Sequence, residues 1–137
     1  MSSEVTIRFE HAKTEDEWRA TLKPEQFRVT VEGADDPDFD NPFWDHFEEG
    51  RYLCIRCGRA LFDAADKYEA NTGAPTFAKP IDNNVVPIHD PRPGHGDEQL
   101  VCTGCGSKLG HLHHDGPPPL GLRYCTNSTA FGFVGED

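Results

Sequence analysis

Five cysteines give this 137-residue chain its clearest chemical signal. Four of them form two Cys-x-x-Cys pairs, and glycine follows each pair directly. The pairs are Cys54 with Cys57 and Cys102 with Cys105. Each pair brings two thiolates onto one tight turn, and the glycine lets the backbone turn toward the sulfurs. Together they offer four soft ligands, which suits a tetrahedral structural Zn²⁺ site. Two disulfides or two redox-active pairs are the alternative interpretations.

The fifth cysteine, Cys125, has no partner of this kind. Arg123 and Asn127 lie two residues before and after it, so on a β-strand the three side chains point to one face. A positive charge and an amide beside a thiol favour the thiolate, which predicts a lowered pKa and a reactive Cys125. An inert, buried thiol is the alternative interpretation.

Histidines near this cysteine are the candidate acids and bases. His111 and His113 share one face of an expected strand, and His114 points away from it. An H-x-H pair is also a common metal-ligand arrangement, so a second metal site is an alternative. The available further ligands are Asp115, His89 and His95. Structural or surface histidines are the simplest interpretation of all.

Short strands must position most of these residues. Turn residues and β-prone runs predict strands at 51–54, 59–62, 85–88, 99–102, 108–113, 122–126 and 130–134. Thr14 and Glu17 have capping-box spacing, which predicts a helix over 14–22. Pro24 starts a further turn, and alternation predicts a strand at 27–31.

Three segments outside the predicted strands carry weaker signals. The acidic segment 33–40 is expected to be a solvated loop and not a cation site. Asn41 followed by Pro42 is typical of a helix start, which predicts one or two helical turns ending at Gly50. The segment 90–98 is expected to be a polar loop rich in turn residues.

Composition limits the classes of partner. The formal net charge of −11 argues against nucleic acid and anionic membranes as partners. No signal peptide or membrane-spanning run is recognisable, so we expect a cytoplasmic protein with reduced thiols. The length predicts a single domain over 1–137 with its core at about 14–134, and we expect a monomer.

Five stretches, in order, carry a more specific signal. They are WRATLKPEQFRVT, FEEGRYLCIRCGRALFDAADKYEANTG, APTFAKPID, CGSKLGHLHHDGP and GLRYCTNSTAFGF. On them the chain resembles the methionine sulfoxide reductase B family from about residue 18 to residue 133. The resemblance implies a mainly β fold, in which antiparallel sheets form a small β-tent-like barrel after short N-terminal helices. It also implies a structural zinc ion on the four paired cysteines.

The resemblance assigns roles to single residues as well. Cys125 stands in the family's RYC-x-N position and would be the nucleophile that attacks a sulfoxide sulfur and ends as a sulfenic acid. His111, in the family's LGH position, would donate or relay a proton. Arg123 and Asn127 match positions that tune and orient the site, and Asp115 matches the aspartate of the family's DGP turn.

The implied activity is thiol-dependent reduction of methionine-R-sulfoxide, protein-bound or free, to methionine. With four cysteines assigned to a metal, no second thiol remains to resolve a sulfenic acid on Cys125. The expected reductant is therefore an external thiol, either thioredoxin or a low-molecular-weight thiol.

Three residues of the implied substrate pocket depart from the family pattern. Ala74 stands where the family usually has Trp, Lys108 where it has His, and His113 where it has Phe. Phe77 and Asp115 complete the expected pocket. Loss of the indole and gain of polar groups predict a wider, more polar pocket. One alternative function is thiol-dependent reduction of another sulfoxide or oxidised sulfur metabolite, and a second is a non-catalytic, zinc-stapled binding module.

Overall fold

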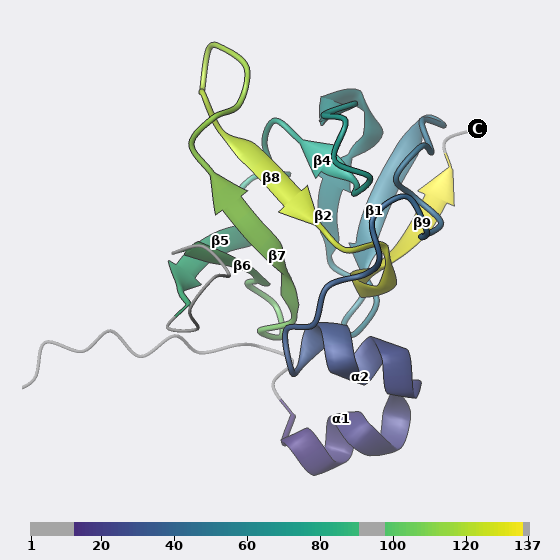
Figure 1. Ribbon diagram of the computed structural model, residues 1–137. Helices are drawn as coiled ribbons and strands as arrows, with labels where there is room; N and C mark the ends of the chain where they lie inside the picture. The colour runs from purple at the N-terminus through teal and green to yellow at the C-terminus, as the bar shows by residue number, and fades with distance from the viewer. Residues whose placement is uncertain (1–12, 91–97, 136–137) are drawn as a thin grey trace, which may run out of the picture.

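The computed structural model describes residues 13–90 and 98–135 (Figure 1). Two helices come first, α1 (Glu15–Thr21) and α2 (Pro24–Thr30). The described strands are β1 (Gly50–Cys54), β2 (Ala60–Asp63), β3 (Lys67–Tyr68), β4 (Thr76–Phe77), β5 (Val85–His89), β6 (Glu98–Cys102), β7 (Lys108–His113), β8 (Arg123–Thr126) and β9 (Phe131–Gly135). Two 3₁₀ turns, η1 (Ala64–Asp66) and η2 (Ser128–Ala130), precede β3 and β9.

The strands form two antiparallel sheets, with the orders β2-β1-β9 and β3-β4-β8-β7-β6-β5. The mainly β, antiparallel fold with short N-terminal helices is therefore confirmed, but the prediction of a barrel is wrong. A barrel closes when the two edge strands of a sheet pair with each other. In the larger sheet the edges are β3, which has only two residues, and β5, and these strands lie at opposite ends of the sheet. The sheets therefore stay open.

Local signals predict most elements correctly. Each of the strands expected between residues 51 and 134 is present to within one residue at either end, while β3 and β4 were not predicted. The capping box of α1 is also present: Glu17 N–H donates to Thr14 Oγ1 at 3.2 Å, and Thr14 N–H donates to Glu17 Oε1 at 3.0 Å. Of the loop predicted at 90–98, residues 91–97 lie outside the described part of the chain.

The strand predicted at 27–31 is wrong, because these residues lie in and just after α2. The helix starts at Pro24, which fits the first turn of a helix since its missing N–H is not needed there. Phe27 and Thr30 are three residues apart and both buried, so the same apolar residues also satisfy a helical period. An apolar run this short fits both the two-residue period of a strand and the 3.6-residue period of a helix.

The helix predicted between Asn41 and Gly50 is also wrong, since this segment forms turns. The Asn41 side chain does not cap a helix. Its Nδ2 donates to the carbonyls of Pro37 and Gly73 at 2.9 Å each, and its Oδ1 accepts a 2.6 Å hydrogen bond from Ser128 Oγ. The bonds to Gly73 and Ser128, which are distant in sequence, fix the backbone as a loop that runs past the end of β8 (Figure 1).

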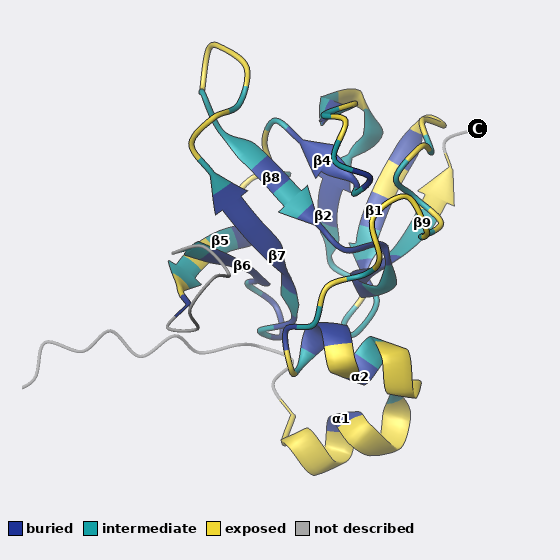
Figure 2. Cartoon of the chain, in the orientation of Figure 1, coloured by how far each residue is buried: buried dark blue, intermediate teal, exposed yellow. Residues whose placement is uncertain are grey.

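Aromatic side chains from both sheets make the core. The rings of Phe62 on β2 and Phe77 on β4 stack with centroids 4.2 Å apart. Tyr52 meets Phe77 edge-on at 5.3 Å, and Phe131 meets Phe62 edge-on at 5.8 Å. Such geometries add to the stabilisation from burial alone. Figure 2 shows β4 and β7 largely buried, whereas α1 presents an exposed outer face. The core thus holds β4, and through it β8, against the smaller sheet.

Strands β7 and β8 approach each other very closely at one glycine. Gly110 lies opposite Thr126, and the next pair is His111 opposite Cys125. Gly110 has a φ of +153°, and a Cβ placed there would lie 2.0 Å from the carbonyl oxygen of Cys125 and 2.8 Å from Thr126 Cα. Only glycine permits this approach without moving a strand.

We expect Gly110→Ala to lower the free energy of unfolding by about 2–3 kcal/mol, because its methyl group must push β7 and β8 apart. Denaturant unfolding followed by circular dichroism measures the change. Gly132→Ala on β9 is the matched control, since its Cβ would meet only Ile55 at 4.0 Å. The control should change stability by less than about 1 kcal/mol. Similar losses in both variants would contradict the close-approach interpretation.

Candidate active site and metal centre

The four paired cysteines converge as the spacing predicted. Their Sγ atoms all lie within 4.8 Å of one another. Cys54 Sγ is 3.5 Å from Cys105 Sγ, and Cys57 Sγ is 3.7 Å from Cys102 Sγ. A disulfide needs about 2.05 Å, and all the cysteines are free thiols, so the disulfide interpretation is wrong. Around a tetrahedral zinc ion with Zn–S bonds of about 2.3 Å, the sulfurs would lie about 3.8 Å apart.

The two Cys-x-x-Cys turns repeat one local geometry. The N–H of Gly58 donates to the carbonyl of Cys54 at 2.8 Å, and Gly106 repeats this bond in the second turn at 2.9 Å. Both glycines have φ near +80°, which glycine adopts without strain. In the second turn, Gly104 N–H also donates to Cys102 Sγ at 3.3 Å, a contact that favours a thiolate.

The electrostatics of this group fit a cation. Hydrogen bonding with Cys102 raises the pKa of Cys54 to about 12 and also raises the pKa of Cys105. Hydrogen bonds from Cys105 and Cys54 lower the pKa of Cys102. The group on its own therefore favours one thiolate, because ionised sulfurs this close repel one another. A divalent cation would favour four thiolates, and a closed set of soft sulfur donors is the chemistry that a structural metal requires.

Arg56 connects the first turn to the helices. Its Nη2 donates to the carbonyl of Cys105 at 3.0 Å, and its Nη1 donates to the carbonyl of Thr30 at the end of α2 at 3.3 Å. The guanidinium carbon lies 3.9 Å from the ring centroid of Trp18 on α1, a cation–π contact. The four-cysteine group therefore also fixes where the two helices pack.

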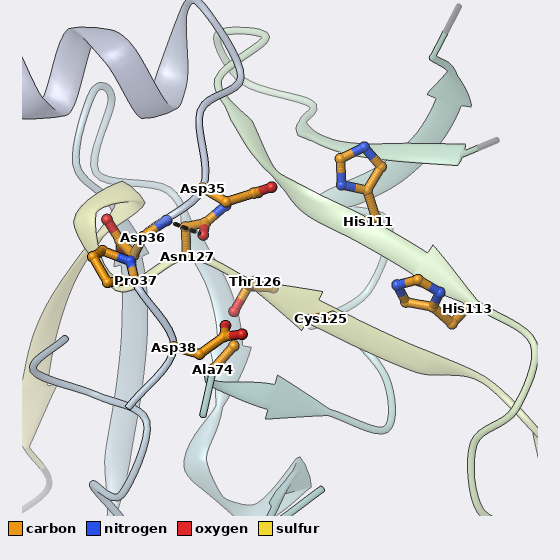
Figure 3. A pocket seen from close by; sticks show the side chains of 10 residues that line it. All are labelled: Asp35, Asp36, Pro37, Asp38, Ala74, His111, His113, Cys125, Thr126 and Asn127. Carbon is orange, nitrogen blue, oxygen red and sulfur yellow. Dashed lines mark hydrogen bonds between the residues drawn. The ribbon is translucent and has the colours of Figure 1, made fainter. Parts of the chain in front are cut away.

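The fifth cysteine lines a separate cavity of about 470 Å³. The residues around this cavity come from the loop after α2, from the segment before β4, from β7 and β8, and from the position directly after β8. They are Asp35, Asp36, Pro37, Asp38, Ala74, His111, His113, Cys125, Thr126 and Asn127. Figure 3 shows the acidic loop on one side of the cavity and the two histidines of β7 on the other. Of the expected site residues, the cavity is lined by Ala74, His111, His113, Cys125 and Asn127, whereas Arg123 and Asp115 are not among its lining residues.

His111 is held by a partner that the sequence analysis missed. Its Nε2 lies 2.8 Å from Oδ2 of Asp90, and both side chains are buried. Asp90 follows β5 directly, and pairing of β5, β6 and β7 brings it to His111. A buried carboxylate on one ring nitrogen fixes the orientation of the imidazole and favours a proton on that nitrogen. No sequence pattern pairs these residues, which are 21 positions apart.

The thiol of Cys125 is protonated more strongly than predicted. Burial raises the pKa of Cys125, and the charges of Asp35 and Asp38 raise it further, while Arg123 acts in the opposite direction. Arg123 is itself engaged, because its Nε and Nη2 donate to the two carboxylate oxygens of Asp115 at 2.8 and 3.3 Å. The predicted lowering of the pKa is therefore wrong, since it considered the neighbouring cation and neither burial nor the carboxylates.

Asn127 holds the acidic loop against the end of β8. Its Oδ1 accepts a 2.8 Å hydrogen bond from Asp36 N–H, and its Nδ2 donates to Oδ1 of Asp35 at 3.2 Å. The Asp36 carboxylate accepts two more bonds from the N–H and hydroxyl of Thr129, at 2.9 and 2.6 Å. The predicted solvated loop is therefore part of the pocket wall. An acidic segment gives no local signal for such contacts with residues about ninety positions away.

The other expected site residues lie at different places. Phe77 is buried in the aromatic core and does not line the cavity. Lys108 begins β7 and is also absent from the lining. His114 pairs with Glu98. Among residues 13–90 and 98–135, the four-cysteine group is the only cluster with metal-ligand geometry, and His95 lies outside those ranges.

Comparison with known proteins agrees with this arrangement. A model of the SelR domain matches residues 22–135. The peptide methionine sulfoxide reductase MsrB of Thiobacillus denitrificans is 40% identical over 126 residues, which cover 91% of this chain and 96% of that protein. The MsrB of Methylibium petroleiphilum is 42% identical over 122 residues, 88% of each chain. The chain belongs to the MsrB family.

Two of the three residues expected to depart from the family pattern, Ala74 and His113, line the cavity. Ala74 contributes only a methyl group to the wall. The pKa of His113 is lowered by burial and by the charge of Arg123, so this side chain is neutral and polar near pH 7. The wall of this MsrB-family pocket is therefore less apolar than one with an indole and a phenyl ring in these positions.

Within the described ranges, neither helix combines the length and the apolar character needed to cross a bilayer. Both are short, and each carries charged residues in its first and last turns.

Arg123→Met should make the Cys125 thiol harder to ionise. Arg123 favours the thiolate, so its removal raises the pKa of Cys125 and lowers the thiolate fraction at every pH below that value. The rate of alkylation of Cys125 by iodoacetamide, measured against pH by peptide mass spectrometry, should reach half its maximum at a higher pH than in the wild type. Arg28→Met removes the same charge from an exposed position on α2 and should leave the profile unchanged. An unchanged profile in Arg123→Met would contradict the assigned role.

Proposed function

We propose that this chain reduces methionine-R-sulfoxide, free or within proteins, to methionine, with Cys125 as the nucleophile. The observation that carries the proposal is the pairing of Cys125 with His111 across β7 and β8, at the wall of an open cavity in an MsrB-family protein. The relatives that match most of this chain are named as peptide methionine sulfoxide reductases. No observation favours another sulfoxide or a non-catalytic binding role.

The proposed chemistry balances in two steps. Cys125 Sγ attacks the sulfoxide sulfur, a proton goes to the sulfoxide oxygen, and the oxygen passes to Sγ as the S–O bond of the substrate breaks. The products are methionine and a sulfenic acid on Cys125, so the substrate is reduced by two electrons and the cysteine is oxidised. Two external thiols then reduce the sulfenic acid, releasing water and a disulfide.

The raised pKa of Cys125 is compatible with this scheme. A thiol that rests protonated brings the proton that the sulfoxide oxygen needs, and its transfer makes the sulfur nucleophilic at the moment of attack. His111 faces Cys125 in the strand register and is oriented by Asp90, which makes it the group that relays this proton. Arg123 supports the developing thiolate.

The reductant is proposed to be a thiol from outside the chain, either thioredoxin or a low-molecular-weight thiol. The four remaining cysteines form the metal-ligand group, and their use as a resolving thiol would disrupt it. We also propose a cytoplasmic monomer without nucleic-acid or membrane partners. The net charge of −11 and the reduced thiols support this setting.

The metal at the four-cysteine group is proposed to be Zn²⁺ with a structural role. Four sulfur donors spaced for tetrahedral coordination support zinc over metals that prefer oxygen ligands. Cys54, Cys57, Cys102 and Cys105 would hold it. The ion would connect the ends of β1 and β6, and thus one sheet to the other.

Replacement of the nucleophile should abolish turnover. We expect Cys125→Ser to lower kcat on methionine-R-sulfoxide by more than about a thousandfold, because a hydroxyl cannot form the sulfenic acid. Product formation by chromatography, with dithiothreitol as reductant, measures the loss, and a dimedone adduct on Cys125 in the wild type detects the sulfenic acid. Unchanged circular dichroism in the variant shows that folding is intact. Turnover that persisted in Cys125→Ser would refute the proposal.

Metal removal should lower stability. Elemental analysis of the purified protein should give about one zinc per chain, as one four-ligand site requires. Chelation should lower Tm and zinc should restore it, because binding energy at such a site contributes to folding. Cys102→Ser should lose both the metal and the stability, whereas Cys125→Ser should keep both. Iron, or no metal at all, in the wild type would contradict the assignment.

A further inference from the structure

Three carboxylates dominate the charge of the Cys125 cavity. Asp35, Asp36 and Asp38 all line it, and Figure 3 shows them on the loop that faces β7 and β8. Arg123, the cation whose charge acts on the Cys125 thiol, forms a two-point ion pair with Asp115, which offsets its charge. The entrance to the nucleophile is therefore net negative at neutral pH.

Two of these carboxylates are held in place and one is available. Asp35 accepts from Asn127, and Asp36 accepts from Thr129, so the loop backbone is anchored to the segment that follows β8. Asp38 is exposed and makes no hydrogen bond or ion pair within residues 13–90 and 98–135. An anchored loop that carries an unpaired carboxylate on a cavity wall offers a ready partner to a bound cation.

We propose that this acidic loop makes the enzyme select sulfoxides that carry an ammonium or guanidinium group near the sulfoxide over neutral and anionic ones. The inference rests on the proposed function and names a substrate class for the same site. Two features of the cavity wall support the selection. Ala74 offers little apolar contact to orient a substrate, and the carboxylates offer a charged contact in its place. Because the loop is partly exposed, the effect should be moderate and should weaken with salt.

Matched substrates test the selection. They are acetylated, amidated peptides with methionine-R-sulfoxide between two lysines, two glutamines or two glutamates, plus methionine-R-sulfoxide amide and its N-acetyl form. We expect kcat/KM to fall from lysine to glutamine to glutamate, by about twofold to fivefold per step at low salt, as for exposed ion pairs. The two amides show whether an α-ammonium group alone is sufficient. Equal kcat/KM for all the peptides would overturn the inference, and no turnover of any would instead refute the proposed function.

The Asp38→Asn variant assigns the effect to the loop. The ratio of kcat/KM for the lysine peptide to that for the glutamate peptide should drop by about twofold to fivefold. A ratio is used because loss of Asp38 also makes the Cys125 thiol more acidic, which changes all rates together. Glu25→Gln, an exposed carboxylate on α2 away from the cavity, is the control of equal charge change and should keep the wild-type ratio. The same ratio in Asp38→Asn and wild type would overturn the inference.

A second readout does not depend on sulfoxide turnover. Alkylthiosulfonates convert a thiol to a mixed disulfide and release a sulfinate, so they report access to Cys125 directly. The ratio of the rate with the trimethylammonium-ethyl reagent to the rate with the sulfonatoethyl reagent should be higher for Cys125 than for a free thiol such as N-acetylcysteine, and Asp38→Asn should lower that ratio. Peptide mass spectrometry locates the label, and Cys125→Ser gives the background. A rate ratio for Cys125 equal to that of the free thiol would show that the cavity has no selective charge and would overturn the inference.

Discussion

The close pairing of β7 with β8 is the constraint from which the site follows. Gly110 leaves no side chain between the strands, so the backbone of Cys125 and Thr126 can lie directly against it. That register places His111 opposite Cys125 and His113 opposite Arg123. A shift by one residue would turn every one of these side chains to the other face. The juxtaposition of thiol and imidazole is therefore a property of the strand pair and not of flexible loops.

The metal centre and the pocket are connected through the N-terminal helices. Arg56 joins the cysteine turns to Thr30 at the end of α2, and the chain then runs within a few residues to Asp35 at the cavity. The Asn127 side chain then binds the backbone of Asp36 and the carboxylate of Asp35. A metal on the four sulfurs would therefore stabilise more than the ends of two strands. It would also fix the helix whose C-terminus sets the start of the acidic loop.

Sequence reasoning succeeds here where interactions are local or where spacing alone defines chemistry. The capping box of Thr14 and Glu17, the strands and the four-cysteine group all follow from residues close together in sequence or from a repeated pattern. It fails where a side chain bonds to a distant segment. Asn41 contacts Gly73 instead of capping a helix, and the acidic loop contacts residues more than ninety positions away. Neither contact can be predicted from the residues that neighbour it in the sequence.

The acidic loop and the raised pKa of Cys125 are two consequences of one charge distribution. Asp35 and Asp38 disfavour the thiolate because they add negative charge beside it. A cation bound at the same carboxylates would offset that charge, and the thiolate would become easier to form while the substrate is present. The nucleophile would then be least reactive in the empty site, where oxidants compete for thiolates, and most reactive beside a cationic sulfoxide. Under this scheme, the carboxylates that select the substrate also determine when the Cys125 thiol ionises, which is when the substrate is bound.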